Sequence, residues 1–363
     1  MKRKMKVGIL TGGGDCPGLN AVIRAVAKKL IIENNSEIIG IKDGYEGLIS
    51  NYYKKLDYSD VSGILTLGGT ILGTSNIANP YRQAVKVGNK TIMKDVSKKV
   101  IQNIKRKKLD CIVCIGGDGT LSIASRLCKD GIPVVGVPKT IDNDIRGTDV
   151  TFGFDTAVSI ATEGIDRIHT TAQSHHRVML VEVMGRTAGW IALHSGIAGG
   201  GDIILLPEIP FEVDKIAAVL KNRYKRGNKF SIIVVSEGAK PKGGKVVVKR
   251  MVKESTIAER LGGISMVLGR QLEEKTGLEA RAVIMGHLLR GGSPTSTDRV
   301  LATQLGTAAA DFVMKNNFGI MAGVKGSSIA AVSLEEVAKG AKLVKANNDL
   351  VSAARSVGTS FGD

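Results

Sequence analysis

Short apolar segments recur along the chain, and most of them end at a glycine or at a polar turn. They are rich in β-branched residues and almost free of polar ones, which is typical of strands buried on both faces of a parallel sheet. The predicted strands are Val7–Leu10, Ile38–Ile41, Ile64–Leu67, Cys111–Ile115, Val134–Val137, Val178–Val183, Ile203–Leu206, Phe230–Val235, Ala282–Met285 and Ile329–Val332.

Helical patterns, with apolar residues three or four positions apart, lie between these strands. The alternation predicts a doubly wound α/β fold with right-handed crossovers, in which ligands bind beyond the carboxyl ends of the strands. Ser333 and Glu336 form a capping box that predicts one more short helix. The longer predicted helices are Asn20–Ile32, Leu121–Lys129, Thr156–Thr170, Thr256–Glu274 and Arg299–Lys315.

The length of the chain, 363 residues, suits two lobes of roughly 150–200 residues each. Hydrophobic residues make up 43% and charged residues 23%, as in an ordinary globular protein. No apolar run is long enough to span a membrane, and the apolar start is too short for a signal peptide. Aromatic residues are only 4%, which argues against a stacking platform for single-stranded nucleic acid.

The formal charge of +17 is spread along the chain, which favours a solvated lysine-rich surface, with steering of phosphorylated substrates as the alternative. The four cysteines are few for this length. Cys111 and Cys114 are three residues apart on a predicted strand, so their thiols should lie on opposite faces and not share a metal. We expect reduced cysteines and a cytoplasmic protein.

Three loops that follow predicted strands carry candidate chemistry. In Gly12–Gly14 and in Gly116–Thr120, glycines let backbone N–H groups approach a phosphate at a helix N-terminus, and Asp118 adds a possible Mg²⁺ ligand. In the third loop, Asp142 and Asp144 should project similarly from an extended segment, so one can accept a proton while the other supports a metal. Plain glycine and Asx turns are the structural alternative.

The motifs TGGGDCPGLN, GGDGT, PKTIDNDIRGTD, FGFDTA, IDRIHTTAQSHHRVMLVEVMGR and RAVIMGHLLRGGSPTSTDR follow one another between about residue 5 and the closing SFGD. With this set the chain resembles the 6-phosphofructokinase family. The resemblance implies two similar Rossmann-like lobes with mainly parallel sheets flanked by helices, and an active site in the cleft between them. It divides the chain into a larger phosphoryl-donor lobe (1–153 and 289–338) and a smaller sugar-phosphate lobe (154–288 and 339–363).

The activity that the resemblance implies is Mg²⁺-dependent phosphoryl transfer from ATP to the C1 hydroxyl of fructose 6-phosphate, in glycolysis. Asp142 resembles the general base, Asp118 the metal ligand and Asp144 a residue beside the metal. The implied catalytic set is Asp142, Asp144, Thr140, Arg186 and Lys139. The implied donor site is Gly14, Asn76, Gly117, Asp118, Gly119 and Thr120. The implied sugar-phosphate site is Thr140, Asp142, Arg177, Met184, Gly185, Arg186, Glu237, Arg281, His287 and Arg290.

The resemblance also implies partners. In the family, the positions that match Arg177 and Arg281 reach across from a neighbouring subunit, so we expect a homotetramer, with a homodimer as the alternative. No nucleic acid or membrane partner is expected. Arg167 and Glu182 are expected to form structural ion pairs rather than to bind a ligand.

Two positions bear on the phosphoryl donor, and they point in different directions. In the family, Gly119 leaves space for the α-phosphate of a nucleotide and favours ATP, whereas Lys139 is typical of pyrophosphate enzymes. The combination matches a mixed-donor subgroup, and we favour ATP. The alternatives are a pyrophosphate-dependent enzyme and a sedoheptulose 7-phosphate kinase.

Asn76 departs from the family, where an arginine helps to bridge the two phosphates; Arg82 is a candidate substitute. This departure is the one feature that favours a non-catalytic sugar-phosphate sensor, and the intact carboxylates at Asp118, Asp142 and Asp144 argue against it. His169 replaces an arginine of the bacterial effector site, so control by a nucleoside diphosphate or phosphoenolpyruvate is not expected.

Overall fold

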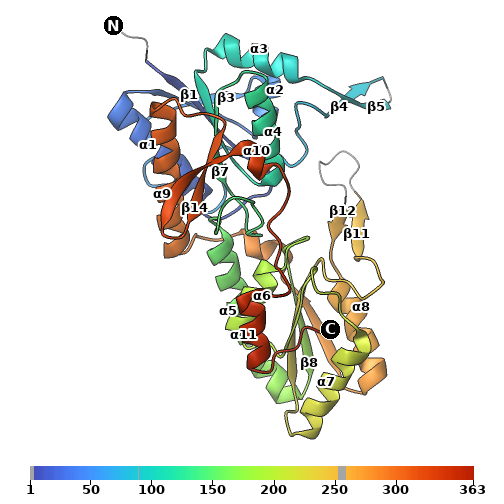
Figure 1. The fold of residues 1–363 in the computed structure, drawn as a ribbon. Coiled ribbons are helices and arrows are strands. Elements are labelled where there is room, and N and C mark those ends of the chain that lie inside the picture. Colours follow the sequence, from blue (N-terminus) through green and yellow to red (C-terminus); the bar gives the residue numbers. More distant parts are fainter. Residues whose placement is uncertain (1–3, 89, 252–258) are drawn as a thin grey trace.

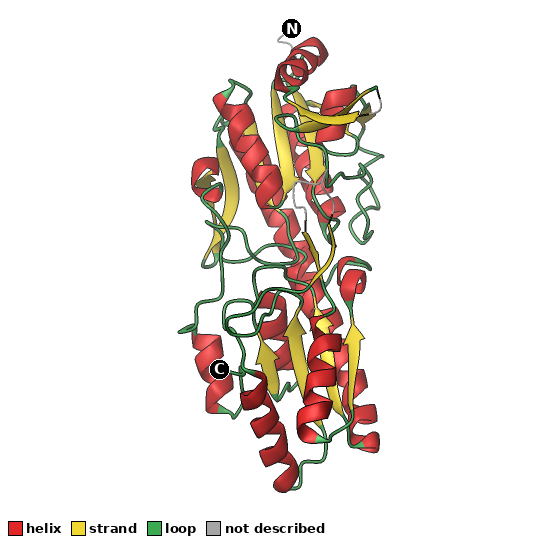
Figure 2. Ribbon diagram, turned by 90° about the vertical axis from the view of Figure 1, so that its right-hand side faces the viewer, coloured by secondary structure: helices red, strands yellow, loops and turns green. Residues whose placement is uncertain are grey.

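Two sheets lying end to end form the frame of the protein (Figures 1 and 2). The computed structural model describes residues 4–88, 90–251 and 259–363. The larger sheet has the strand order β15-β14-β7-β6-β1-β2-β3; its five central strands are parallel, and β15 and β3 are antiparallel at the two edges. Its strands are β1 (Lys6–Gly12), β2 (Glu37–Ile41), β3 (Tyr53–Leu56), β6 (Cys111–Gly116), β7 (Val134–Pro138), β14 (Ile320–Lys325) and β15 (Ser328–Ser333).

The smaller sheet is parallel throughout, in the order β13-β8-β10-β9. Two antiparallel hairpins stand outside both sheets. The strands of the smaller sheet are β8 (Val178–Val183), β9 (Ile203–Leu205), β10 (Ser231–Ser236) and β13 (Ala280–Ile284), and those of the hairpins are β4 (Gln83–Val87), β5 (Lys90–Lys94), β11 (Val248–Met251) and β12 (Glu259–Leu261).

Helices cover both faces of each sheet, as Figure 2 shows. On the larger sheet, α1 (Leu19–Asn34) and α9 (Ser296–Met314) share one hydrophobic cluster, and the other cluster holds α2 (Tyr45–Ser50), α3 (Ser97–Lys107), α4 (Asp118–Lys129) and α10 (Leu334–Val337). On the smaller sheet, α5 (Phe154–His175), α6 (Trp190–Ala198) and α11 (Asp349–Ser356) pack on one face and α7 (Val213–Lys225) and α8 (Ile264–Thr276) on the other. The central strands of both sheets are therefore buried, as their apolar sequences predict.

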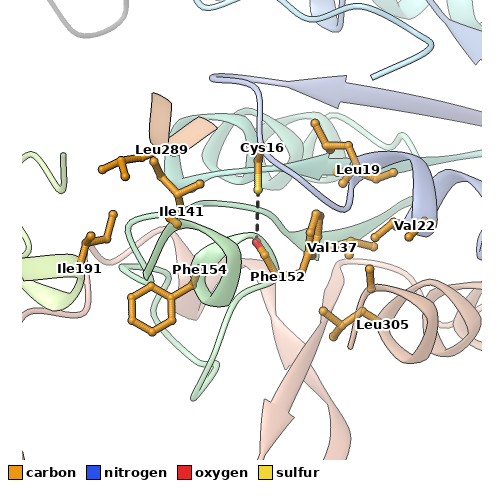
Figure 3. Packing of buried hydrophobic residues seen from close by; sticks show 14 of the residues in the cluster. Cys16, Leu19, Val22, Val137, Ile141, Phe152, Phe154, Ile191, Leu289 and Leu305 are labelled. Atoms are coloured by element: carbon orange, nitrogen blue, oxygen red, sulfur yellow. Dashed lines mark hydrogen bonds between the residues drawn. The ribbon is translucent and has the colours of Figure 1, made fainter. Parts of the chain in front are cut away.

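One hydrophobic cluster runs from the larger sheet into the smaller lobe. Ile141 and Leu289 lie between the sheets and belong to the same cluster as Phe154 and Ile191 of the smaller lobe (Figure 3). The two lobes share a core, so we expect them to unfold together rather than as independent units.

The arrangement of the cysteines confirms the strand prediction for β6. Cys111 belongs to the cluster on the α1–α9 side of the sheet, and Cys114 belongs to the cluster on the opposite side. Burial raises the pKa of each thiol to about 12, so both stay protonated. All four cysteines are free.

One predicted strand is wrong. The segment Ile64–Leu67 forms turns instead. The buried side chain of Asn20 binds backbone groups at the end of this segment and just beyond it. The Asn20 amide donates to the carbonyl oxygens of residues 67 and 69, at 3.1 and 2.8 Å, and accepts from the N–H of Ile71 at 2.9 Å. These bonds occupy backbone groups that a sheet ladder would need.

The later elements also differ from the sequence pattern. The predicted helix over 256–274 begins only at Ile264; residues 259–261 form β12, and residues 256–258 lie outside the described part. The segment Ile329–Val332 is a strand, but it pairs antiparallel with β14, which the prediction missed. Ser333 does cap α10, by accepting from the N–H of Glu335 at 3.2 Å, while Glu336 binds Arg146 instead of closing a capping box.

Across the described ranges, no helix combines the length and the apolar character that a membrane crossing requires.

Candidate active site

The loops after β1 and β6 lie side by side and are joined by Thr120. A Cβ atom on Gly12 would come within 2.7 Å of the Thr120 hydroxyl, and one on Gly116 would come within 2.3 Å of the Thr120 Cβ. Both positions therefore require glycine. The hydroxyl of Tyr45 donates to the Thr120 carbonyl at 2.7 Å, which fixes the first turn of α4. The two glycine loops predicted from the sequence thus form one surface.

Lys139 and Arg290 join the first glycine loop to the rest of the site. The Lys139 Nζ donates to the carbonyl oxygen of Gly14 at 2.5 Å, and an Arg290 Nη donates to the carbonyl oxygen of Asp15 at 3.1 Å. A Cβ atom on Gly14 would lie 2.7 Å from the same guanidinium nitrogen, so Gly14 leaves room for the arginine. Two cations from distant parts of the chain converge here.

The loop that carries the two aspartates is bent rather than extended, which corrects the sequence expectation. The backbone at Asn143 is left-handed, with φ of 51°, a conformation that Asn tolerates better than most residues. The Thr140 hydroxyl accepts from the N–H of Asp142 at 3.0 Å, and the Thr140 carbonyl accepts from the hydroxyl of Thr151 at 2.8 Å. Both carboxylates still lie in one buried cluster.

Burial dominates the electrostatics of this pair. Asp142 and Asp144 are each only 5% exposed. Desolvation raises the pKa of Asp142, while the cations Arg290, Arg186 and Lys139 oppose the rise. Desolvation, and next the charge of Asp142, raise the pKa of Asp144 to about 7. The Asp142 Oδ1 is buried and has no hydrogen-bond partner among the described residues, so this oxygen is able to accept a hydrogen bond from a substrate.

The smaller lobe faces this cluster with the loops after β8 and β10. Gly185 and Arg186 both have positive φ, 144° and 51°, and a Cβ on Gly185 would come within 2.5 Å of the Ala188 carbonyl. The N–H of Arg186 donates to a Glu237 carboxylate oxygen at 3.2 Å. Burial, followed by the charge of Asp142, raises the pKa of Glu237 to about 7. The carboxyl edges of the two sheets therefore face each other. Met184, which directly precedes Gly185, is half-buried and packs against the hydrophobic cluster that the two lobes share.

Asp118 stands at the first residue of α4, half-buried, and its Oδ1 accepts from the N–H of Gly119 at 2.7 Å. Gly119 is exposed, and a Cβ there would meet no atom within 4 Å. The described residues contain no cluster of three or more His, Cys, Asp or Glu side chains that could hold a metal alone. A magnesium ion bound by one or two carboxylates together with substrate phosphates fits this donor set better than an all-protein cage.

The segment around Asn76 lies against the first glycine loop. The hydroxyl of Thr74 donates to the carbonyl of Gly13 at 2.6 Å, and the carbonyl of Ser75 accepts from the N–H of Gly13 at 3.2 Å. Asn76 is exposed and follows directly after these contacts.

Two residues of the implied sugar-phosphate site, Arg177 and Arg281, lie elsewhere. Arg177 and Arg281 are at the amino end of the smaller sheet, where both bind the carboxylate of Glu279; the Arg177 contact is 2.9 Å. The six residues of β8 separate Arg177 from the Arg186 loop by roughly 20 Å of strand. His287 is exposed in the short 3-10 helix η1 (Gly286–Arg290). Arg177 and Arg281 therefore lie at the far end of the smaller sheet from Asp142, whereas His287 shares its helix with Arg290, whose charge acts on Asp142.

Two residues set aside as structural have defined partners. Arg167 forms an exposed ion pair with Glu163 at 2.7 Å, as expected. Within the described ranges, Glu182 pairs with no cation: its buried carboxylate accepts from the N–H groups of Gly263 and Ser265 at 2.8 and 2.9 Å and so caps α8. It meets the positive end of the helix dipole there.

Three more residues border the site. The sequence did not single out Lys342 or Trp190, and Glu208 stands in a PE motif of the resemblance to which no role was given. Lys342 contacts residues 139–151, the loop that carries Asp142 and Asp144, which we call the aspartate loop. Trp190 and Glu208 contact the segment that carries Lys342. A lysine among 51 basic residues gives no signal of its own.

The fold and the facing loops define the class: a doubly wound α/β protein whose parallel sheets meet at their carboxyl edges, where such proteins bind their ligands. A family model described as Phosphofructokinase matches residues 6–313. A curated relative, "ATP-dependent 6-phosphofructokinase 2" of Clostridium perfringens, is 52% identical over 99% of this chain and 98% of its own. The chain belongs to the phosphofructokinase family, and it is a kinase.

Two further comparisons extend this result. "Pyrophosphate--fructose 6-phosphate 1-phosphotransferase" of Amycolatopsis mediterranei is 50% identical over 94% of this chain and 96% of its own. The crystal structure of Pichia pastoris phosphofructokinase in the T-state matches with a TM-score of 0.80 and 30% identity, over 99% of this chain and 37% of that longer chain. Relatives named for two different phosphoryl donors are thus about equally similar to this chain.

Proposed function

We propose that this protein is an ATP-dependent 6-phosphofructokinase, which transfers a phosphoryl group to the C1 hydroxyl of fructose 6-phosphate. The observation that carries the proposal is the buried Oδ1 of Asp142, which has no partner and lies among the cations Arg290, Arg186 and Lys139. A carboxylate held in this way suits the proton of a substrate hydroxyl.

In the proposed reaction, Asp142 accepts the proton as the C1 oxygen attacks the terminal phosphorus of the donor. Phosphoryl transfer depends mainly on positioning and on charge stabilisation rather than on covalent catalysis. Arg186 and Lys139 lie close enough to Asp142 to influence its charge, so they are suited to stabilise the negative charge of the transferred group. Backbone N–H groups of the loops at Gly14 and 117–120 are proposed to bind the donor phosphates.

Asp118 and Asp144 would hold Mg²⁺ together with the donor phosphates. When bound, the ion would neutralise phosphate charge and orient the terminal group. Asp144, with a pKa raised to about 7, would be ionised more readily beside a cation.

A second copy of the chain is proposed to complete the sugar-phosphate site. Arg177 and Arg281 are too far from Asp142 of their own chain, so they would bind the 6-phosphate in a neighbouring subunit. The edge strand β13 supports this, because Val283, Ile284 and Leu288 on and beside it are 36%, 45% and 68% exposed. An unpaired edge with apolar side chains is suited to a subunit interface. The proposed assembly is a homotetramer, with a homodimer as the alternative.

The donor has one competing candidate. Gly119 is open and favours ATP, but Lys139 and the 50% identical pyrophosphate-named relative favour pyrophosphate. The lobe bounds given above, 1–153 with 289–338 and 154–288 with 339–363, and a cytoplasmic location remain part of the proposal.

The test is formation of fructose 1,6-bisphosphate from fructose 6-phosphate and Mg²⁺, with ATP and pyrophosphate assayed side by side. Activity with ATP that disappears on chelation supports the proposal. Activity with pyrophosphate alone overturns the donor, and sedoheptulose 7-phosphate as the only good acceptor overturns the sugar. Silence with both donors and both sugars, in a protein that still binds fructose 6-phosphate, would indicate a sensor.

A further inference from the structure

Residues 338–348, which we call the strap, connect α10 in the larger lobe with α11 in the smaller lobe (Figure 1). Figure 1 shows this segment running alongside both sheets rather than within either. Lys342 is half-buried in its middle, and Val344 is 2% exposed. The strap therefore packs on the protein although it contains no helix or strand.

The ammonium group of Lys342 forms hydrogen bonds with the aspartate loop. Its Nζ donates to the Asn143 Oδ1 at 3.2 Å and to the carbonyl oxygens of Thr148 and Asp149 at 3.0 and 2.7 Å. The three N–H donors of an ammonium group are thus matched by three acceptors. The backbone N–H of Lys342 donates to the carbonyl of Asp144 at 2.8 Å, which adds a fourth bond to the same loop.

Asn143 is the central contact, because it lies between Asp142 and Asp144 in a left-handed conformation. Its Oδ1 also accepts from the N–H of Thr151 at 3.1 Å. A left-handed non-glycine residue is less favourable than a right-handed one even for Asn, so surrounding contacts help to hold it. The Lys342 ammonium is one of these contacts, and it acts on the residue that sets the directions of both carboxylates.

The other side of the strap is attached to the smaller lobe. The Trp190 Nε1 donates to the Lys342 carbonyl at 2.9 Å, and the N–H of Val344 donates to the Glu208 carboxylate at 2.9 Å. The same Glu208 oxygen accepts from the N–H of Gly189 at 3.0 Å. Gly189 and Trp190 follow the Arg186 loop directly, so the strap joins the aspartate loop to the loop that faces it.

The environment of Lys342 is unfavourable for a lysine. Burial lowers its pKa to about 8, although Asp149 and Asp144 oppose this effect; Lys325 adds to it. A partly buried ammonium costs free energy unless it is well bonded. At this position an ammonium group makes hydrogen bonds that an apolar side chain could not make.

We propose that Lys342 is a positioning residue for phosphoryl transfer: it fixes the loop of Asp142 and Asp144 through Asn143 and, through the strap, sets the spacing between that loop and Arg186. The expected loss of turnover rests on the proposed function, whereas the expected loosening of the aspartate loop does not. Lys342 touches no proposed substrate atom, so its removal should lower kcat and leave both KM values nearly unchanged. A misplacement of the order of 1 Å at a reacting centre costs about 100-fold in rate.

The kinetic test compares Lys342→Met with Lys345→Met, an exposed lysine of the same strap. We expect Lys342→Met to lower kcat by about 10- to 100-fold with KM values within about threefold of wild type. Lys345→Met should match wild type. Lys342→Arg keeps the charge but replaces the compact donor by a planar one, so an intermediate kcat is expected. Full activity in Lys342→Met overturns the proposal.

A double-mutant cycle separates positioning from general stability. If Lys342 acts through Asn143, then Lys342→Met should cost much less activity in an Asn143→Ala background than in the wild-type background. Additive losses, or a fall in melting temperature that accounts for the lost activity at the assay temperature, overturn it.

Hydrogen exchange provides a readout that does not depend on activity. In the ligand-free protein, amides of residues 139–151, above all Thr151, should exchange faster in Lys342→Met than in Lys345→Met. Unchanged exchange overturns the positioning role even if the variant is inactive. An inactive wild type with the expected exchange difference would instead overturn the proposed function alone.

Discussion

The Nζ of Lys139 lies 2.5 Å from the carbonyl oxygen of Gly14, so the loop with the two aspartates is bonded directly to the first glycine loop. Lys139 is 3% exposed, and desolvation lowers the pKa of its ammonium group. This contact links the proposed proton acceptor to the proposed phosphate cradle, and it places a cation where the transferred charge would develop.

Lys139→Met is therefore expected to lower turnover by about 100-fold, as for loss of one preorganised donor to a developing charge. Steady-state kinetics with each donor provides the measurement. A matched control is Lys42→Met, which removes a lysine-to-carbonyl bond of 2.9 Å to Ile71 outside the aspartate cluster. Equal losses in the two variants would show that the effect is structural.

Asp142→Asn should lower turnover by about 100-fold or more, because the amide cannot accept the proton. Binding of fructose 6-phosphate, measured by calorimetry, should stay within a few fold, and the melting temperature should not fall, since a buried carboxylate is replaced by a neutral group of the same shape. Asp166→Asn, on the exposed side of α5, is the control. Lost sugar binding with normal turnover of the bound fraction would contradict the assignment.

Gly119→Asp should abolish the use of ATP and leave the fold intact. A Cβ at this position meets no atom within 4 Å, so the side chain would extend into the space proposed for the α-phosphate. Gly119→Ala tests size without charge and should retain most activity with ATP. The ratio of kcat/KM for ATP to that for pyrophosphate is the readout, and an unchanged ratio in Gly119→Asp would place the nucleotide elsewhere.

Mixed oligomers test whether Arg281 acts in a neighbouring subunit. Asp142→Asn and Arg281→Ala should each be nearly inactive with fructose 6-phosphate. After unfolding and refolding together in equal amounts, about a quarter of the sites in random dimers would have both residues intact. Activity should return toward that fraction. No recovery, in assemblies shown to contain both variants, would mean that Arg281 serves its own chain or none.

Glu237 should make the ligand-free protein less stable as the pH rises. Its pKa is about 7 in the folded state against an ordinary 4.5, so the folded protein holds a proton that the unfolded chain has already lost. The stability that this proton contributes is present below about pH 4.5 and is lost as the pH rises to about 7. Melting temperatures between pH 5 and 8 should fall less steeply in Glu237→Gln than in wild type. Parallel curves would contradict the shift.

The strands and the loops after them could be predicted from the sequence because they depend on local pattern. A strand buried on both faces, such as Val178–Val183, leaves an unbroken apolar run, and the glycines at 116 and 117 mark the close turn that follows β6. Strand β14 and the turns at Ile64–Leu67 could not be predicted, because each depends on a partner far along the chain. That partner is β7, with which β14 pairs in parallel, for the strand, and Asn20 for the turns.

The same distinction, between local sequence pattern and contacts that form only on folding, applies to the residues of the candidate site. Asp118, Asp142 and Asp144 stand in motifs and were found by spacing and resemblance. Lys342 lies 199 positions from Asn143, in a segment without regular structure, and only the folded chain brings the two together. The bend at Asn143 was also missed, because a left-handed residue within an apparently extended run has no periodic signature.

The order of the strands in the larger sheet has a consequence for synthesis. The outer edge of β7 is covered by β14, and β14 follows only after residues 139–319 have been made. At ordinary rates of translation, this edge stays open for roughly 10–40 s on every nascent chain. For that time each ribosome carries a strand edge that another nascent chain on the same messenger could pair with. The rate of translation through the smaller lobe should therefore influence how much of the protein reaches its native state.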